Sequence, residues 1–275
     1  LGVLAVVAVV LGSAGGSWSG DRASGDRLRL WQTQAPRGAE GDTSVEVQLP
    51  TSTSTKVELP GGLSVDFLHG TTTVAFVTDA GIVAAVDSRA SLGRLVGSGT
   101  TDKVLPVSGQ ILGTMAGGAA DCSYWIRALS MQIRLWELRE GKNATAVSAA
   151  HVLATMLRQN RGGGLSVGTM IMGFDARGEP GIHYVDDSGM CTKGTLFAVG
   201  SGSPYAIGVL DSEYRRDLDL DVAVDLAMRA VQRATHRDAF SGGIINVYLL
   251  PKGDKPWRQV RRVRSGTLPR PNQAD

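Results

Sequence analysis

The chain has 275 residues, of which 43% are hydrophobic and 20% charged, so it is long enough to bury a sizeable core and its composition is that of a globular protein. Its formal net charge of +2 is too small to argue for a nucleic-acid partner. The two cysteines, Cys122 and Cys191, cannot form a disulfide framework and fit a reducing compartment, and with the four scattered histidines they offer no zinc-ligand spacing.

The N-terminal quarter of the chain differs from the rest. Residues 1–12 are an apolar run that is shorter than the roughly 20 residues of a membrane helix, and the core of a signal peptide is a rival interpretation. Secretion would make the sequon at Asn143 a glycosylation site. Residues 13–60 are rich in Ser, Gly, Thr, Arg and Pro, and we predict that they are mostly flexible, with order beginning near Gly61.

Two β-hairpins are predicted next. Residues 71–78, TTTVAFVT, are rich in strand-forming residues, and a turn at 79–81 leads into the apolar strand 81–88. The segments 103–107 and 110–117 predict a second hairpin around Ser108-Gly109.

Three helices and four further strands are predicted after the hairpins. A helix over 118–140 places four large side chains on one face, and a helix over 145–160 ends at a run of glycines. The first face comprises Trp125, Leu129, Ile133 and Trp136. A helix over 219–235 has Leu220, Val224, Met228 and Val231 on one face. The strands are predicted at 165–175, 181–187, 195–202 and 242–251, and residues 261–275 are predicted to be a solvated basic tail.

This order of elements predicts the fold class. Hairpins favour antiparallel sheets, and helices that arrive in blocks argue against a doubly wound βαβ fold. Two sheets between two helix layers would bury both faces of each sheet, which explains why strands such as GIVAAV are almost continuously apolar. We therefore predict an α+β fold, a four-layer αββα sandwich of two antiparallel sheets.

The chemistry suggested by the residues alone is that of an N-terminal threonine. The chain has no HExxH or P-loop motif, its Gly-rich stretch 200–208 lacks dinucleotide-site spacing, and no histidine is placed for a Ser-His-Asp triad. A threonine can use its own α-amine as the base, which requires a cut between Gly70 and Thr71. A nearby cation, Lys103, would depress the pKa of the amine and hydroxyl, and Asp87 would hold that cation in place.

An ordinary structural interpretation stands beside this one. Three threonines in a row are common in strands, Asp87 could simply end a strand, and Lys103 could lie on the surface. In both interpretations the second and third threonines, Thr72 and Thr73, serve only the strand.

Six segments decide between these interpretations, because together they resemble a known family. The segments are HGTTTVAF (69–76), GIVAAVDSRAS (81–91), ILGTMAGGAADC (111–122), GLSVGTMIMGFD (164–175), GSGSPYAIGVLDSEYR (200–215) and ATHRDAFSGG (234–243). In order and spacing, over roughly residues 71–248, they resemble the β subunits of the 20S proteasome, specifically the β5 type. The resemblance implies the N-terminal nucleophile hydrolase fold and a threonine endopeptidase that cleaves after large hydrophobic residues. It also implies that residues 1–70 are a propeptide, removed by a cut between Gly70 and Thr71, and that 71–275 are the peptidase domain with a solvated tail.

The resemblance also implies the site residues. Thr71 matches the nucleophile and Gly117 the backbone donor to the oxyanion. The catalytic set is completed by Asp87, Lys103, Ser201, Asp238 and Ser241. By their residue types alone, Ser201 and the segment 238–243 would serve equally well as a turn and a loop. By the same resemblance, the S1 pocket, which holds the side chain before the cleaved bond, would be lined by Ala90, Thr101, Leu105, Met115, Ala119 and Cys122. Thr101 and Leu105 stand where the family usually has other aliphatic residues, and the loop at 94–99 is unlike the usual one before the lysine, which bears on substrate preference.

The implied setting is an assembled particle. The partners would be the other α and β subunits of a stacked-ring 20S particle and unfolded polypeptide substrates, without nucleic acid, membrane, metal or cofactor. The location would be the cytoplasm and nucleus, within ubiquitin-dependent protein degradation. A non-catalytic structural subunit of the same particle, or a secreted protein, are the alternatives.

Overall fold

The computed structural model describes residues 6–8, 56–59, 63–66, 70–92, 95–253 and 255–268. All of these belong to one compact unit made of residues 1–10 and 52–275. Most of the apolar N-terminal run, the predicted flexible segment up to residue 55 and the last residues of the predicted tail (269–275) lie outside the described residues.

The first sheet contains the segment that begins at Thr71. Its strand order is β1-β14-β4-β5-β15-β16, and every neighbouring pair is antiparallel. The strands are β1 (Val6–Ala8), β14 (Leu196–Val199), β4 (Thr73–Thr78), β5 (Gly81–Val86), β15 (Ile244–Pro251) and β16 (Arg258–Arg264).

The second sheet has the order β13-β12-β11-β9-β8, with β10 paired to β11, and it is also antiparallel. Its strands are β13 (Cys191–Gly194), β12 (Pro180–Asp186), β11 (Val167–Phe174), β9 (Ile111–Thr114), β8 (Val104–Ser108) and β10 (Ala116–Gly117). Two separate hairpins complete the described strands: β2 (Lys56–Leu59) with β3 (Leu63–Asp66), and β6 (Ala90–Leu92) with β7 (Leu95–Ser98).

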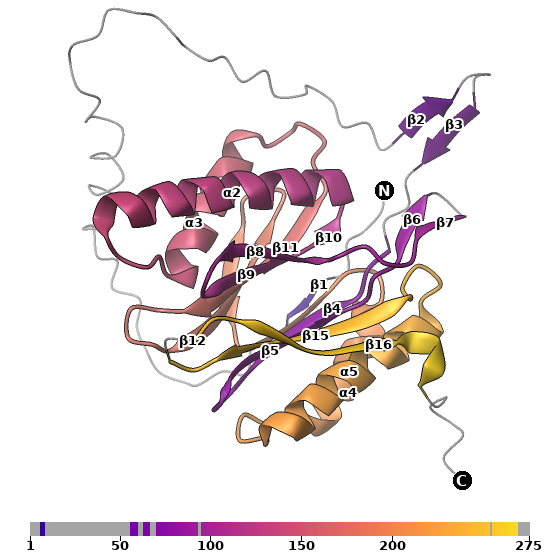
Figure 1. Cartoon of the computed structure of the whole chain (residues 1–275). Helices are drawn as coiled ribbons and strands as arrows, with labels where there is room; N and C mark the ends of the chain where they lie inside the picture. The colour runs from indigo at the N-terminus through magenta and orange to yellow at the C-terminus, as the bar shows by residue number, and fades with distance from the viewer. Residues whose placement is uncertain are drawn as a thin grey trace, which may run out of the picture. The chain divides into compact units, whose positions relative to one another are not determined.

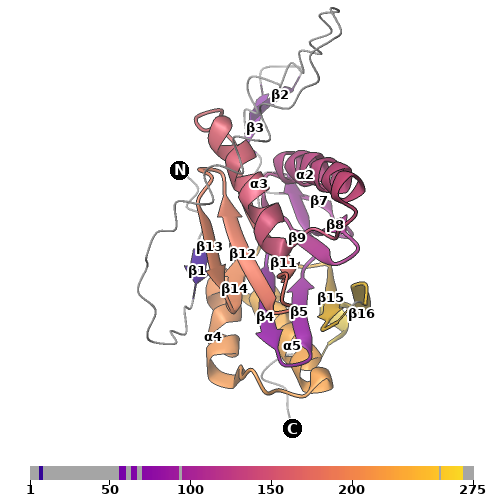
Figure 2. The ribbon, with the colours of Figure 1, turned by 90° about the vertical axis from the view of Figure 1, so that its left-hand side faces the viewer.

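Helices cover the outer face of each sheet. The second sheet lies under α2 (Ala119–Glu140) and α3 (Ala146–Gln159), and the first sheet packs on α4 (Ser203–Glu213) and α5 (Leu220–Arg237) (Figures 1 and 2). A short 3-10 turn (Ser265–Thr267) follows β16. The predicted αββα sandwich is therefore confirmed, and no helix within the described ranges is long and apolar enough to cross a membrane.

Three apolar clusters fill the spaces between the four layers, which explains the uninterrupted apolar strands. Along β4, Val74 and Phe76 face α4 and α5, whereas Ala75 and Val77 face the second sheet. The third cluster lies between the second sheet and α2 and α3. Because side chains alternate between the two faces of a strand, a strand buried on both faces must be apolar at every position.

Most of the predicted elements exist, with two corrections. The strand expected at 195–202 ends at Val199, and the Gly-rich stretch after it turns into helix α4, which begins at Ser203 with a proline in its first turn. Proline suits that position because the first helical N–H groups have no intrahelical partner.

The predicted basic tail is wrong at its start, since residues 258–264 form the edge strand β16. Most side chains of β16 are exposed, so an arginine-rich sequence is compatible with a strand there, and charge at a sheet edge discourages further strand pairing. The strands β1, β2, β3, β6, β7 and β13 were also not predicted; they are only three or four residues long. Strand β2 corrects the end of the segment 13–60 that was predicted to be mostly flexible, because residues 56–59 pair with β3.

Candidate active site

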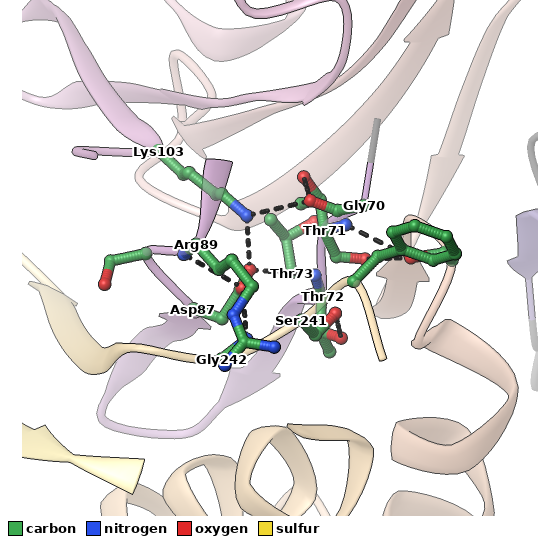
Figure 3. Close-up of polar contacts among 12 residues, drawn as sticks. Gly70, Thr71, Thr72, Thr73, Asp87, Arg89, Lys103, Ser241 and Gly242 are labelled. Carbon is green, nitrogen blue, oxygen red and sulfur yellow. Dashed lines mark hydrogen bonds and ion pairs between the residues drawn. The ribbon is translucent and has the colours of Figure 1, made fainter. Parts of the chain in front are cut away.

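The hairpin of β4 and β5 places the start of β4 beside the end of β5, and the site lies at this end of the hairpin. Thr73 pairs with Val86, so the residues just outside the ladder, Thr72 and Asp87, are neighbours. The Asp87 amide donates to the Thr72 carbonyl over 3.1 Å, and the Thr72 amide donates to Asp87 Oδ1 over 2.9 Å. Lys103, which comes just before β8, reaches the same carboxylate (Figure 3).

Asp87 and Lys103 form a buried ion pair. Lys103 Nζ lies 2.6 Å from Asp87 Oδ1, and the two side chains are 3% and 0% exposed. Asp87 Oδ2 accepts from the amides of Gly242 (2.9 Å) and Arg89 (3.2 Å), so both of its oxygens are bound. Burial lowers the pKa of Lys103, an effect that the charge and hydrogen bond of Asp87 oppose. The lysine is therefore held in a fixed position with an amine that gives up its proton more easily than a solvated one.

A second polar group is centred on Asp238, the residue at the C-terminal cap of α5. Its Oδ2 accepts from Ser201 Oγ over 2.6 Å and from Ser241 Oγ over 2.5 Å. The Thr71 amide nitrogen donates to Ser201 Oγ over 3.2 Å. The structure thus brings Ser201, Asp238 and Ser241 together beside the backbone nitrogen of Thr71.

Thr71 lies between these two groups with its side chain 5% exposed. Its hydroxyl donates to the Gly70 carbonyl oxygen over 2.7 Å, and Lys103 Nζ donates to the same oxygen over 3.2 Å. A Cβ at position 70 would lie 1.8 Å from the Cβ of Phe240, so only glycine fits there. The requirement for glycine is thus steric crowding by Phe240.

Gly117 lies at the end of β10, just before the N-terminal cap of α2. Its φ is +107°, and a Cβ there would lie 2.6 Å from the Ser166 carbonyl oxygen, so the position requires glycine for its conformation and for space.

The six residues expected to line S1 fall into two sets. Leu105, Met115 and Cys122 pack in the cluster beneath α2, where Cys122 is fully buried and burial raises the pKa of its thiol to about 12. Ala90 and Thr101 are half-buried, and Ala119 is exposed at the start of α2.

Thr72 is a polar residue of the site that sequence reasoning missed. It was expected to serve only the strand, but its fully buried Oγ1 lies 2.7 Å from Ser241 Oγ. Thr73 does serve the strand, because its hydroxyl donates to the Val199 carbonyl of the neighbouring strand β14 over 3.1 Å. No local pattern distinguishes the two residues, since the partner of Thr72 is 169 positions away.

The described residues hold no cluster of three or more His, Cys, Asp or Glu side chains that could bind a metal ion. A hydroxyl and a buried lysine amine contact the Gly70 carbonyl oxygen, and a carboxylate-bound serine contacts the nitrogen of the same peptide bond. These groups are suited to acyl transfer through a side-chain oxygen. An αββα sandwich with such a threonine before a strand of its first sheet defines the N-terminal nucleophile hydrolase fold.

Comparison with known proteins agrees with this class. Residues 67–250 match the family model described as "Proteasome subunit", and the chain belongs to that family. It is 48% identical over 226 residues to proteasome subunit beta type-5 of Gallus gallus, which covers 82% of this chain and 86% of the relative. It is 48% identical over 199 residues to proteasome subunit beta type-5 of Spinacia oleracea (72% of each chain). Proteasome subunit beta type-8 of Rattus norvegicus is 47% identical over 190 residues (69% of this chain, 68% of the relative). Within the family the chain is of the β5 type.

Proposed function

We propose that the chain is the precursor of a threonine endopeptidase whose nucleophile is Thr71, freed by cleavage after Gly70. The observation that carries the proposal is the pair of contacts to the Gly70 carbonyl: the Thr71 hydroxyl at 2.7 Å and Lys103 Nζ at 3.2 Å act on one oxygen. A cation on that oxygen polarises the carbonyl, and the hydroxyl next to it is the nearest nucleophile.

Self-processing is proposed to follow from these contacts. Thr71 Oγ1 forms a bond to the Gly70 carbonyl carbon, the bond from that carbon to the Thr71 nitrogen breaks, and the hydroxyl proton passes to that nitrogen. Water then hydrolyses the resulting ester, which leaves a carboxylate on Gly70 and a free α-amine on Thr71. The lowered pKa of Lys103 suits it to exchange a proton with the hydroxyl.

Substrate cleavage would repeat the same chemistry on another chain. The free amine of Thr71, next to Ser201, would serve as base, and the Thr71 hydroxyl would form an acyl-enzyme that water releases. The amide of Gly117 is the proposed donor to the oxyanion. The side chains of Leu105, Met115 and Cys122 would form the base of a pocket for large apolar residues, with Ala90, Thr101 and Ala119 at its sides.

The proposed setting is the 20S particle, where family membership implies assembly with other subunits. Substrates would be unfolded polypeptides, and the location the cytoplasm and nucleus. A fluorescent fusion tests the location, because signal confined to the secretory pathway would contradict it.

The proposal is tested with Thr71→Ala in the full-length chain, assembled with its partner subunits. We expect residues 1–70 to remain attached and cleavage after large hydrophobic residues to be lost, whereas wild-type chains begin at Thr71 by N-terminal sequencing. Thr71→Ser is the matched control, since it keeps a hydroxyl and should retain the cut. Two results would contradict the proposal and favour the structural-subunit alternative. One is undiminished peptide hydrolysis by Thr71→Ala, and the other is a wild-type particle in which residues 65–75 stay intact.

A further inference from the structure

We propose that Thr72 is a positioning residue for the reaction, because its hydroxyl and its amide join the two polar groups that flank Thr71. This inference rests on the proposed function. It concerns the second threonine of the TTT stretch, which no local feature marks as more than a strand residue. In Figure 3 Thr72 lies between Ser241 on one side and the Asp87 carboxylate on the other.

The direction of the hydrogen bonds follows from counting protons. Ser241 has a single hydroxyl proton, which it donates to Asp238 Oδ2 over 2.5 Å. In the 2.7 Å contact between the two hydroxyls, Ser241 must therefore accept and Thr72 must donate. The result is a directed chain in which Thr72 donates to Ser241 and Ser241 donates to Asp238. Ser201 donates to the same carboxylate oxygen and receives the Thr71 N–H.

The backbone of Thr72 is bound as firmly as its side chain. Its amide donates to Asp87 Oδ1 over 2.9 Å, and the carbonyl of the same peptide group, that of Thr71, accepts from the Gly202 amide over 3.3 Å. Three segments far apart in the chain thus hold the residue next to the nucleophile. Since a peptide group is planar, fixing this one fixes the direction in which Thr71 leaves it.

Water cannot replace the Thr72 hydroxyl if it is removed. Both Thr72 and Ser241 are completely buried, and a Cβ placed on Gly202 would lie 2.0 Å from Thr72 Oγ1, so the backbone of Gly202 closes that side. A missing hydroxyl would leave Ser241 without its donor at a buried position. We therefore expect loss of the Thr72 hydroxyl to shift the series of hydrogen bonds from Thr72 to Asp238 more than it changes the packing of side chains.

The triple threonine supplies its own matched variants. Thr72→Val removes the hydroxyl and keeps the branched shape, Thr72→Ser keeps the hydroxyl and removes the methyl, and Thr73→Val makes the same chemical change one residue away. Each is assembled in the full particle, and rates are normalised to the fraction of chains that begin at Thr71. The substrate is a fluorogenic peptide with a large apolar residue before the cleaved bond.

For Thr72→Val we expect kcat about tenfold lower with KM unchanged, the size of one lost buried hydrogen bond. Thr72→Ser should recover at least half of the lost rate, and Thr73→Val should keep the wild-type kcat. Ser241→Ala should lower kcat as well, and adding Thr72→Val to it should lower kcat little further, because the acceptor is already gone. Where Thr72→Val assembles poorly, Thr72→Ala, which also removes the hydroxyl, makes the same comparison with Ser241→Ala.

A wild-type kcat in Thr72→Val would overturn the inference, as would an equal loss in Thr72→Ser, which would assign the effect to the methyl group. Equal losses in Thr72→Val and Thr73→Val, with equal falls in Tm, would show only a loosened strand. The proposed function fails separately, through an active Thr71→Ala.

Discussion

Replacing Gly202 by alanine should displace Thr72, the residue after the proposed nucleophile, without straining the backbone. Gly202 has φ −88° and ψ −1°, a conformation open to alanine, so any effect must come from the new methyl group. That Cβ would lie 2.0 Å from Thr72 Oγ1, 3.1 Å from Ala234 Cβ and 3.2 Å from Asp238 Oδ2. The new methyl group would therefore meet Thr72, helix α5 and the Asp238 carboxylate at the same time.

The magnitude follows from the overlap. A distance of 2.0 Å is well short of the 3.4 Å at which ordinary contact begins, so Thr72 or the start of α4 has to move by about 1 Å. Over-packing of this kind costs about 1–3 kcal/mol of folding free energy. A displacement of about 1 Å next to the reacting group lowers the rate by about a hundredfold. We therefore expect a large loss of kcat in Gly202→Ala together with a moderate fall in the unfolding midpoint.

The assay compares two glycines at one helix. Gly208 lies exposed within α4, and a Cβ there meets nothing within 4 Å, so Gly208→Ala should keep the wild-type kcat and stabilise the chain by about 0.5–1 kcal/mol. Thr72→Ala removes the overlapped oxygen, so Gly202→Ala should cost less in that background than in the wild type. Equal kinetics for Gly202→Ala and Gly208→Ala would refute the steric argument and the placement of Thr72.

Three further predictions concern buried groups. His183 is 3% exposed, and its Nε2 has no hydrogen-bond partner. Burial, together with the charge of Lys193, lowers its pKa to about 4. The neutral imidazole should therefore contribute its full share to the free energy of unfolding above pH 6.5, and this free energy should fall by about 3 kcal/mol as the pH drops from 6.5 through 4. Denaturant titrations should show this fall, and His183→Gln should abolish it; an unchanged fall would contradict the assignment. The Cys122 thiol, whose pKa burial raises to about 12, should resist iodoacetamide at pH 8 in the native chain and react after unfolding, as followed by mass spectrometry; rapid native labelling would disprove its burial. Asp87→Asn should destabilise the chain by about 3–5 kcal/mol by leaving the buried Lys103 without its carboxylate, and an unchanged Tm would argue against this ion pair.

The elements with a strong local pattern could be predicted from the sequence. The spacing of Trp125, Leu129 and Ile133 marks a helix face, and these three residues are buried beneath α2. Helix α4 escaped prediction because GSGSP at its start is typical of a turn, and its 11 residues begin only a short Gly-rich turn after strand β14. Strand β16 escaped because its arginines face solvent on an edge strand, where the apolar alternation that marks most strands is not required.

The site residues could be predicted from two sources only: their position relative to the β4–β5 hairpin and their resemblance to the family. Asp87 and Lys103 lie next to strand ends, where the sequence places them near Thr71. The role of Thr72 depends on a partner that follows α5, and no spacing rule connects two hydroxyls so far apart. The same limit applies to Gly242, whose amide holds Asp87 Oδ2 from 155 positions away.

The dependence of the site on Asp238, Ser241 and Gly242 also sets the time at which it can exist. A ribosome that adds about 5–20 residues per second needs roughly ten to thirty seconds to travel from Thr71 to Gly242. During that interval Ser201 and Thr72 have no carboxylate to connect them, and Asp87 Oδ2 lacks one of its two amide donors. Under the proposed function, the nascent chain therefore carries its threonine without a complete site, and synthesis itself delays the proposed first cut until the segment just before β15 has been made.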